Sequence, residues 1–273
     1  MKEKIEIKEI GSYFDVDSDG YIINPASHKK IQEKWSPAIN SVIDLYKNEF
    51  GEKLKTVYVR GSVAKGKAIE NVSDLDTFAY IHLEKESFPK GWTEEFRESF
   101  QKEYPFINGV DIMLKPVSIE SQGMILLNQS LCVFGEESGV SKIKVGKNLI
   151  LHAPNLQKRF NMFYEFKENR KHKVNEECEW QMKGILRTSL EMLIEKSGKY
   201  SRDLYPCYKL FSAYYPEKEA EMQNVLHLAL NPTNKIEEIE DVINGIGSWL
   251  IKEIQHVLDI KQSQEVSIKA KTV

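Results

Sequence analysis

The sequence is poor in cysteine and has almost no excess of either charge. Its three cysteines, Cys132, Cys178 and Cys207, are odd in number and far apart, which fits neither a disulfide framework nor a zinc site. We therefore expect a protein of the reducing cytoplasm. The 38 basic and 41 acidic residues leave a net charge of -3, so bulk electrostatics does not favour nucleic acid as a partner.

Long hydrophobic runs are also missing. No segment approaches the roughly 18 to 20 uninterrupted apolar residues of a membrane helix, and the first residues, MKEKIEIKEIG, lack the apolar stretch of a signal peptide. We expect no membrane partner. Apolar and aromatic residues are nevertheless plentiful, with 41% hydrophobic residues, 12 Phe, 12 Tyr and 4 Trp, which excludes a disordered chain. The 273 residues allow one large domain or two ordinary ones.

The hydrophobic pattern changes along the chain and predicts an α+β fold. Strands are expected at residues 54–60, 75–82, 110–114 and 131–134, the last at a sheet edge, and helices at 27–50 (divided at Pro37), 93–104 and 118–129. After about residue 153 only helical periods remain, at 155–173, 176–197, 206–214, 217–230 and 235–262. We expect an α+β domain over residues 1–150, followed by an all-helical, up-and-down bundle over residues 151–273.

The acidic stretch DVDSDG at residues 15–20 imitates the start of an EF-hand calcium loop. However, Ala26 stands where the loop needs its bidentate Glu, and the flanks alternate like strands. With the alternating residues 4–8 before it and the apolar YII after it, this stretch predicts a β-hairpin.

The stretch from Val57 to Ile81 carries the residues that point to chemistry. A hydrophobic strand ends in Gly61-Ser62, where the backbone can turn and present amide groups, and Asp74-Leu75-Asp76 follows after eleven residues. Alternation places both aspartates on one face of the next strand, about 6 to 7 Å apart. Such carboxylates repel each other, and a divalent cation such as Mg²⁺, which takes hard oxygen ligands, removes the repulsion.

A third acid repeats this pattern. Asp111 opens the strand VDIML among apolar neighbours, where a lone charge is costly. If this strand lies beside residues 75–82, the three carboxylates converge next to the Gly-Ser turn. Such an arrangement contains the parts of a two-metal phosphoryl-transfer site.

These residues resemble the signature of the polymerase-β-type nucleotidyltransferase superfamily, in which an apolar residue and Gly-Gly or Gly-Ser precede Asp-apolar-Asp/Glu by about nine to thirteen residues. Arg60 departs from it, because an apolar residue is expected before Gly61. The layout most resembles the bacterial antibiotic (aminoglycoside or lincosamide) nucleotidyltransferases.

The resemblance implies a small mixed-sheet nucleotidyltransferase domain and a helical domain, with NTP and Mg²⁺ in the cleft between them. Gly61 and Ser62 would contact the nucleotide phosphates. Asp74 and Asp76 would bind Mg²⁺, two ions in all, and Asp111 would complete the metal site or activate the acceptor hydroxyl. A Glu of the helical domain remains the alternative general base. The reaction implied is transfer of NMP from NTP to an acceptor hydroxyl, with release of pyrophosphate.

Several cations are placed to neutralise a triphosphate. Lys65 lies on the Gly-Ser loop. In the resembled family, cationic and Tyr residues of the helical domain reach the terminal phosphates, and Lys199, Tyr200 and Arg202 match them by location and type. Arg187, in a mostly apolar helix, is either a buried ion-pair partner or a cleft residue.

The acceptor, the base of the NTP and the oligomeric state are left open. A small molecule such as an antibiotic is the first expectation for the acceptor, and a protein or an RNA end is the alternative. A regulatory module that holds a nucleotide without turnover is the rival outside enzymes.

Overall fold

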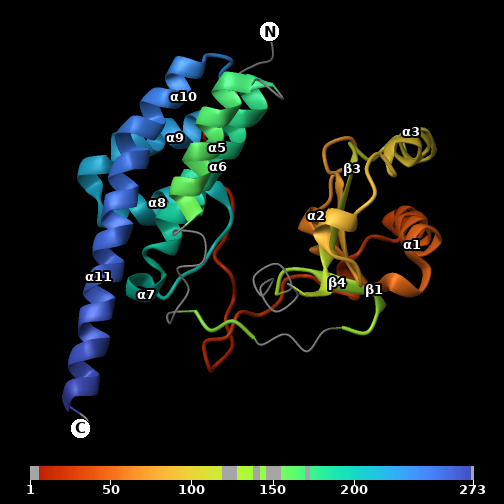
Figure 1. The fold of residues 1–273 in the computed structure, drawn as a ribbon, viewed down its shortest axis with the longest axis horizontal. Coiled ribbons are helices and arrows are strands. Elements are labelled where there is room, and N and C mark those ends of the chain that lie inside the picture. The colour runs from red at the N-terminus through yellow and green to blue at the C-terminus, as the bar shows by residue number, and fades with distance from the viewer. Residues whose placement is uncertain (1–5, 119–127, 138–141, 146–154, 170–172, 272–273) are drawn as a thin grey trace. The chain divides into compact units, whose positions relative to one another are not determined.

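The computed structural model describes residues 6–118, 128–137, 142–145, 155–169 and 173–271. The chain divides into two compact units, one of Asp15–Lys144 and one of Met1–Phe14 with Val145–Val273. The first contains a sheet and the second is helical (Figure 1), so the predicted α+β class is confirmed. The domain boundaries predicted from the sequence, 1–150 and 151–273, place the N-terminal segment with the sheet, whereas the structure groups it with the helices. No helix in the described parts of the chain is long and apolar enough to cross a membrane.

The sheet of the first unit has four strands in the order β3-β2-β1-β4. Their bounds are β1 (Leu54–Arg60), β2 (Leu75–Ile81), β3 (Val110–Pro116) and β4 (Leu131–Gly135). The central strands β1 and β2 are antiparallel, β4 pairs antiparallel with β1, and β3 pairs parallel with β2. The four strands predicted from the sequence are confirmed, and β4 lies at an edge as expected.

The two faces of the sheet are covered differently. On one face, α1 (Ser36–Phe50) and α3 (Glu94–Glu103) contribute to a large core that includes Tyr46, Val57 and Phe100. On the other face, Tyr58, Phe78 and Tyr80 form a small aromatic cluster, with the rings of Tyr58 and Phe78 stacked at 4.9 Å. Because side chains alternate along a strand, residues two positions from this cluster share its face.

Three local predictions for this unit are decided by the structure. Pro37 does not divide a helix but lies in the first turn of α1, where its missing amide is tolerated, and single 3₁₀ turns precede it. The hairpin turn is confirmed by the bridge between Val16 and Ile22, within which Asp17 Oδ1 accepts the backbone N–H groups of Asp19 and Tyr21. Residues 6–8 form no strand, so the strand expected there is wrong. The helix expected at 118–129 falls mostly on residues 119–127, outside the described residues.

The helical unit is built around α6, which packs against α5, α8 and α9. Its helices are α5 (Leu156–Asn169), α6 (Val174–Glu191), α7 (Ile194–Ser197), α8 (Leu204–Tyr214), α9 (Glu219–Leu230), α10 (Ile236–Val242) and α11 (Ser248–Lys271). The predicted helices are confirmed, with two interruptions. The helix expected at 176–197 breaks after Glu191, and the one expected at 235–262 contains a π-helical stretch, Ile243–Gly247.

The N-terminal segment is attached to the helical unit by the loop before α8. The Ser201 hydroxyl donates to the Ser12 carbonyl at 2.7 Å and accepts the Asp203 N–H at 3.0 Å. Asp203 Oδ2 accepts the Ser12 N–H at 3.0 Å. Phe14 stacks on Tyr200 with ring centroids 5.4 Å apart. This part of the fold joins residues almost 200 positions apart.

We expect Ser201→Ala to lower the free energy of unfolding by about 1 to 3 kcal/mol, because the buried Ser201 hydroxyl makes two hydrogen bonds, to the Ser12 carbonyl and from the Asp203 N–H, and the variant loses both. Ser197→Ala is the matched control, since the Ser197 hydroxyl accepts only an exposed N–H, that of Lys199, and should change stability by less than about 0.5 kcal/mol. Urea denaturation of the variants measures both changes. Equal losses would show that Ser201 does not hold the segment.

Candidate functional site

The turn after β1 brings the backbone against an acidic side chain. The chain leaves β1 at Arg60 and turns at Gly61, whose φ is +73°, into the short helix α2 (Gly61–Ala64). A Cβ on Gly61 would lie 2.1 Å from Asp76 Oδ2. Two requirements thus coincide at Gly61, a left-handed backbone and the absence of a side chain, and the turn approaches Asp76 directly.

The strand register aligns three charged residues in a row. Arg60 on β1 lies opposite Asp76 on β2, and Asp76 lies opposite Asp111 on β3. The prediction that β3 lies beside β2 and brings Asp111 to Asp76 is confirmed. The Thr77 hydroxyl fixes this register further by donating to the Asp111 carbonyl at 2.8 Å. By alternation, the charged row lies on the face of the aromatic cluster formed by Tyr58, Phe78 and Tyr80.

Arg60 joins the two acids. Its Nη2 lies 3.0 Å from Asp76 Oδ1 and 2.8 Å from Asp111 Oδ2. The exposed fractions of the three side chains are 29% for Arg60, 19% for Asp76 and 39% for Asp111. One guanidinium nitrogen therefore bridges two carboxylates in a partly desolvated site, where charge-assisted hydrogen bonds are strong.

The pKa of Asp76 shows how incompletely its charge is balanced. Burial raises the pKa of its carboxyl above the usual value, and Asp74 and Asp111 raise it further. The cations Arg60 and Lys65 act in the opposite direction without prevailing. An acid that stays under-compensated after pairing with Arg60 has capacity for another cation.

Asp74 and Asp76 offer carboxylate oxygens that could bind a divalent cation. Carboxylate oxygens are what Mg²⁺ prefers, and Asp76 presents Oδ2 toward the Gly61 turn, away from the oxygen that Arg60 contacts. Asp74 lies exposed two residues before Asp76, just ahead of β2. Among the residues that the structure describes, no three His, Cys, Asp or Glu side chains form a metal-binding group. The chemistry of Asp74 and Asp76 fits Mg²⁺, whereas the position between Asp76 and Asp111 holds the guanidinium.

The remaining predicted residues of this unit lie around the turn. Lys65, which follows α2, is near enough to lower the pKa of Asp76. Ser62 is half-buried on α2, and its carbonyl accepts the Lys67 N–H at 2.9 Å. The structure thus brings Gly61, Lys65, Asp76 and Asp111 together.

The three residues predicted in the helical unit separate into two environments. Tyr200 is 2% exposed and stacks on Phe14, and burial raises its pKa to about 12. Lys199 Nζ lies 5.1 Å from the centre of the Tyr13 ring. Tyr200 and Lys199 therefore contact the N-terminal segment. Arg202 instead lines a cavity of about 310 Å³.

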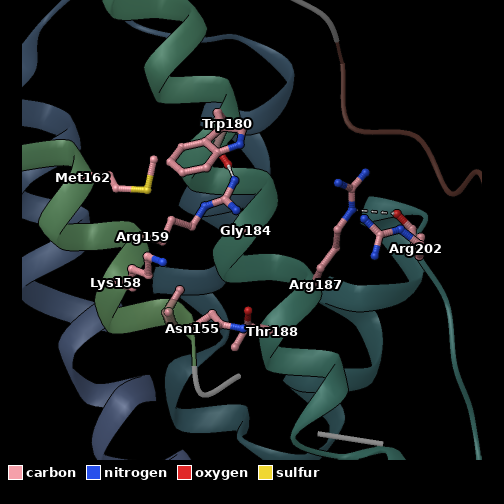
Figure 2. Close-up of a pocket in the computed structure, with 10 residues that line it drawn as sticks. Asn155, Lys158, Arg159, Met162, Trp180, Gly184, Arg187, Thr188 and Arg202 are labelled. Atoms are coloured by element: carbon pink, nitrogen blue, oxygen red, sulfur yellow. Dashed lines mark hydrogen bonds between the residues drawn. The ribbon is translucent and has the colours of Figure 1, made fainter. Parts of the chain in front are cut away.

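This cavity is rich in cations (Figure 2). Its lining residues are Asn155, Leu156, Lys158, Arg159, Met162, Trp180, Gly184, Arg187, Thr188 and Arg202. Among the described residues that line it, four are cationic and none is a carboxylate. The Arg187 Nε donates to the Arg202 carbonyl at 3.3 Å, which holds these two arginines side by side. We call this site the arginine cavity.

Arg159 occupies the other wall of the arginine cavity. Its guanidinium carbon lies 3.5 Å from the centre of the Trp180 ring, and it donates to the Trp180 carbonyl. A Cβ on Gly184 would come within 2.3 Å of Arg159 Nε, so the glycine leaves room for the guanidinium. Burial, together with Arg187 and Arg202, lowers the pKa of Arg159 to about 10. Mutual repulsion of this kind is relieved when an anion binds.

The chain resembles few known proteins. No protein-family model matches the chain, and no curated protein matches it. Its structure is similar to that of spectinomycin adenyltransferase AAD(9) from Enterococcus faecialis with ATP and spectinomycin, at 12% identity and a TM-score of 0.47, over 81% of this chain and 99% of that one. It is also similar to a mutant of the toxin-antitoxin MntA-HpeT, at 14% identity and a TM-score of 0.26, over 47% of this chain and 92% of that one.

The first of these two proteins is, by its name, a nucleotidyl-transferring enzyme. At these TM-scores and identities neither likeness assigns an activity to this chain.

Sequence reasoning missed two features of these sites. The sequence marks Arg60 as a departure from the motif and as a cation near the triphosphate, but not as a partner of the acids. A cation at the end of one strand, beside two strands that carry acids, could have indicated these ion pairs. Arg159 and Trp180 gave no signal, because their approach depends on the packing of α5 against α6. Arg187 is placed in the arginine cavity.

We expect Gly61→Ala to destabilise the protein by about 1 to 3 kcal/mol more than Gly20→Ala does. Both glycines have positive φ, +73° for Gly61 and +83° for Gly20, but a Cβ on Gly20 meets only the Lys144 side chain at 3.5 Å. The Gly20 variant therefore measures backbone strain alone, whereas the Gly61 variant must also displace Asp76. Chemical denaturation compares them, and equal losses would contradict the close approach of the turn to Asp76.

Proposed function

We propose that this chain is a nucleotidyltransferase, which transfers a nucleoside monophosphate from a nucleoside triphosphate to an acceptor hydroxyl and releases pyrophosphate. One observation carries the proposal: Asp76 is aligned with Asp111 across two parallel strands and is contacted by a glycine turn. A core does not need such a group, because burial makes the charge of Asp76 unfavourable. The turn and the acids supply both parts that phosphoryl transfer requires, a close backbone approach and carboxylates for a cation.

In the proposed reaction the acceptor oxygen attacks the α-phosphorus of the nucleotide. A new P–O bond forms while the bond from that phosphorus to the α,β-bridging oxygen breaks, and its electron pair leaves with pyrophosphate. We assign the hydroxyl proton to Asp111, which is the more exposed of the paired acids and retains an oxygen that Arg60 does not contact.

Asp74 and Asp76 are the residues proposed to hold a divalent cation, with Mg²⁺ as the expected ion. When bound, the cation would offset the charge of the triphosphate and polarise the phosphate under attack. Gly61, Ser62 and Lys65 are proposed to position the phosphates beside it, as the motif implies.

The helical unit, taken by itself, offers a place for an anion in the arginine cavity. Its cationic lining suits the anionic end of a nucleoside triphosphate, and Arg202 is the predicted residue that faces it. Lys199 and Tyr200 have contacts of their own with Tyr13 and Phe14. We therefore assign phosphate binding to Arg202, together with its neighbour Arg187.

The acceptor is proposed to be a small molecule with a free hydroxyl, such as an antibiotic. The similar adenyltransferase structure holds ATP and spectinomycin, which makes these two compounds the first to test. A protein or an RNA end stays in the acceptor panel. Incubation with each of four labelled NTPs, Mg²⁺ and this panel, followed by detection of labelled product and pyrophosphate, tests the activity.

A nucleotide-binding module without turnover is the second candidate, and Arg60 favours it. The guanidinium already neutralises part of the charge that would attract a metal ion. Saturable NTP binding, with no pyrophosphate released for any acceptor of the panel, would support this module over the enzyme.

We expect Asp76→Asn to lower nucleotide turnover by several orders of magnitude without destabilising the apoprotein. A raised carboxyl pKa favours folding only below the usual pKa of Asp, and this contribution is lost as the pH rises through the raised value. At neutral pH the substitution therefore removes an unfavourable charge while it keeps an acceptor for Arg60. The melting temperature should stay level or rise.

The control for this variant is Asp44→Asn, which removes an exposed acid of α1. Its turnover should equal that of the wild type. Near-native turnover of Asp76→Asn in the same assay would remove Asp76 from the catalytic site.

We expect Arg202→Ala to weaken NTP binding by about 1.5 to 3 kcal/mol, the range of a charge-assisted hydrogen bond, and NMP binding by much less. Lys199→Ala is the comparison, because it removes a nearby cation that contacts Tyr13. Calorimetric titration with a non-hydrolysable NTP and with NMP measures each loss. A small, equal loss for both nucleotides would show that Arg202 does not bind the terminal phosphates.

A further inference from the structure

The position between Asp76 and Asp111 already contains a cation that belongs to the chain. Arg60 Nη2 contacts an oxygen of each acid, at 3.0 and 2.8 Å. The sequence pattern that these acids follow has an apolar residue in place of Arg60, and it implies two metal ions. The side chain that departs from the pattern thus stands where a bridging ion would bind.

Charge balance argues that the guanidinium replaces such an ion. The three carboxylates Asp74, Asp76 and Asp111, together with Arg60 and Lys65, leave one net negative charge, which a single divalent cation already more than offsets. A second divalent cation would have to bind beside a guanidinium with no surplus negative charge left to offset it. Like charges at such separations repel strongly in a partly buried site.

The geometry leaves one set of oxygens for that single cation. Arg60 contacts Oδ1 of Asp76, while Oδ2 lies at the Gly61 turn. Asp74 is exposed and lies two residues before Asp76, just ahead of β2. Asp111, in contrast, lies on the neighbouring strand β3, where one of its oxygens is bound to Arg60.

We propose that Arg60 permanently takes the place of one of two metal ions, so that the chain binds a single divalent cation through Asp74 and Asp76, with Asp111 outside its coordination. Arg60 is then a positioning residue, which holds Asp76 and Asp111 in register. This inference rests on the proposed function.

The test counts Mn²⁺ ions per chain by the loss of the free-ion EPR signal during titration of the full-length protein. The wild type should bind one Mn²⁺ at this site, and Arg60→Met, which restores the apolar residue of the pattern, should bind two. Arg60→Lys keeps a positive charge and should bind one. Lys115→Met is the matched control, because it removes a partly buried cation of β3 that has no hydrogen bond or ion pair with the acids among the residues that the structure describes. It should also bind one.

A second measurement does not depend on the folding of Arg60→Met. Asp111→Asn should change the Mn²⁺ affinity of the wild type by less than about threefold, because Asp111 lies outside the coordination, whereas Asp76→Asn should weaken it more than about tenfold. The melting temperature with and without Mn²⁺ gives an independent reading of the same affinities.

Two Mn²⁺ ions in the wild type, with one lost in Asp111→Asn, would overturn the inference and leave the proposed function intact. A folded Arg60→Met variant that still binds one ion would overturn it as well. If Mn²⁺ binds neither the wild type nor Arg60→Met, or binds without regard to Asp76, then the metal assignment of the proposed function fails together with it.

Discussion

The ion pairs of Arg60 with Asp76 and Asp111 are the interaction on which the rest of the sheet unit depends. They tie β1 to β2 and β3 on one face, next to the aromatic cluster of Tyr58, Phe78 and Tyr80. Register is the reason for their importance, because a slip of one residue would send each of these charges into the large core of the opposite face. Pairing also limits the cost of burying Asp76, since removing one partner of such a set leaves an unpaired charge.

The aromatic cluster and the charged row show how a stable scaffold can carry an unfavourable site. Stacked rings and buried strands supply apolar contacts independently of the acids. The uncompensated negative charge of Asp76 and the excess positive charge around Arg159 each destabilise the folded protein, and no neighbouring group fully removes either cost. Both costs fall on partly exposed groups, which a ligand of opposite charge can reach.

Much of this could be predicted from the sequence, because the deciding signals are local. Buried strands read as short apolar runs, and β1 was located from Leu54–Arg60 alone. The pairing of Asp76 with Asp111 followed from an assumed neighbourhood of their strands. What could not be predicted depends on distant packing. The roles of Arg60 and Arg159 need a partner strand or helix to be in place, and the attachment of residues before Asp15 to the helices rests on hydrogen bonds such as that between Ser12 and Ser201, for which neither residue gives a local signal.

That attachment has a consequence for the order in which the chain folds. The sheet unit, Asp15–Lys144, is an insertion between two pieces of the helical unit. As the chain is synthesised, the insertion is complete before the loop at Ser201 has emerged, so the sheet can fold first. The segment before it must wait until α6 and α8 are made. The contact between Ser12 and Asp203, 191 residues apart, therefore closes a long loop whose entropic cost the folded insertion has already reduced.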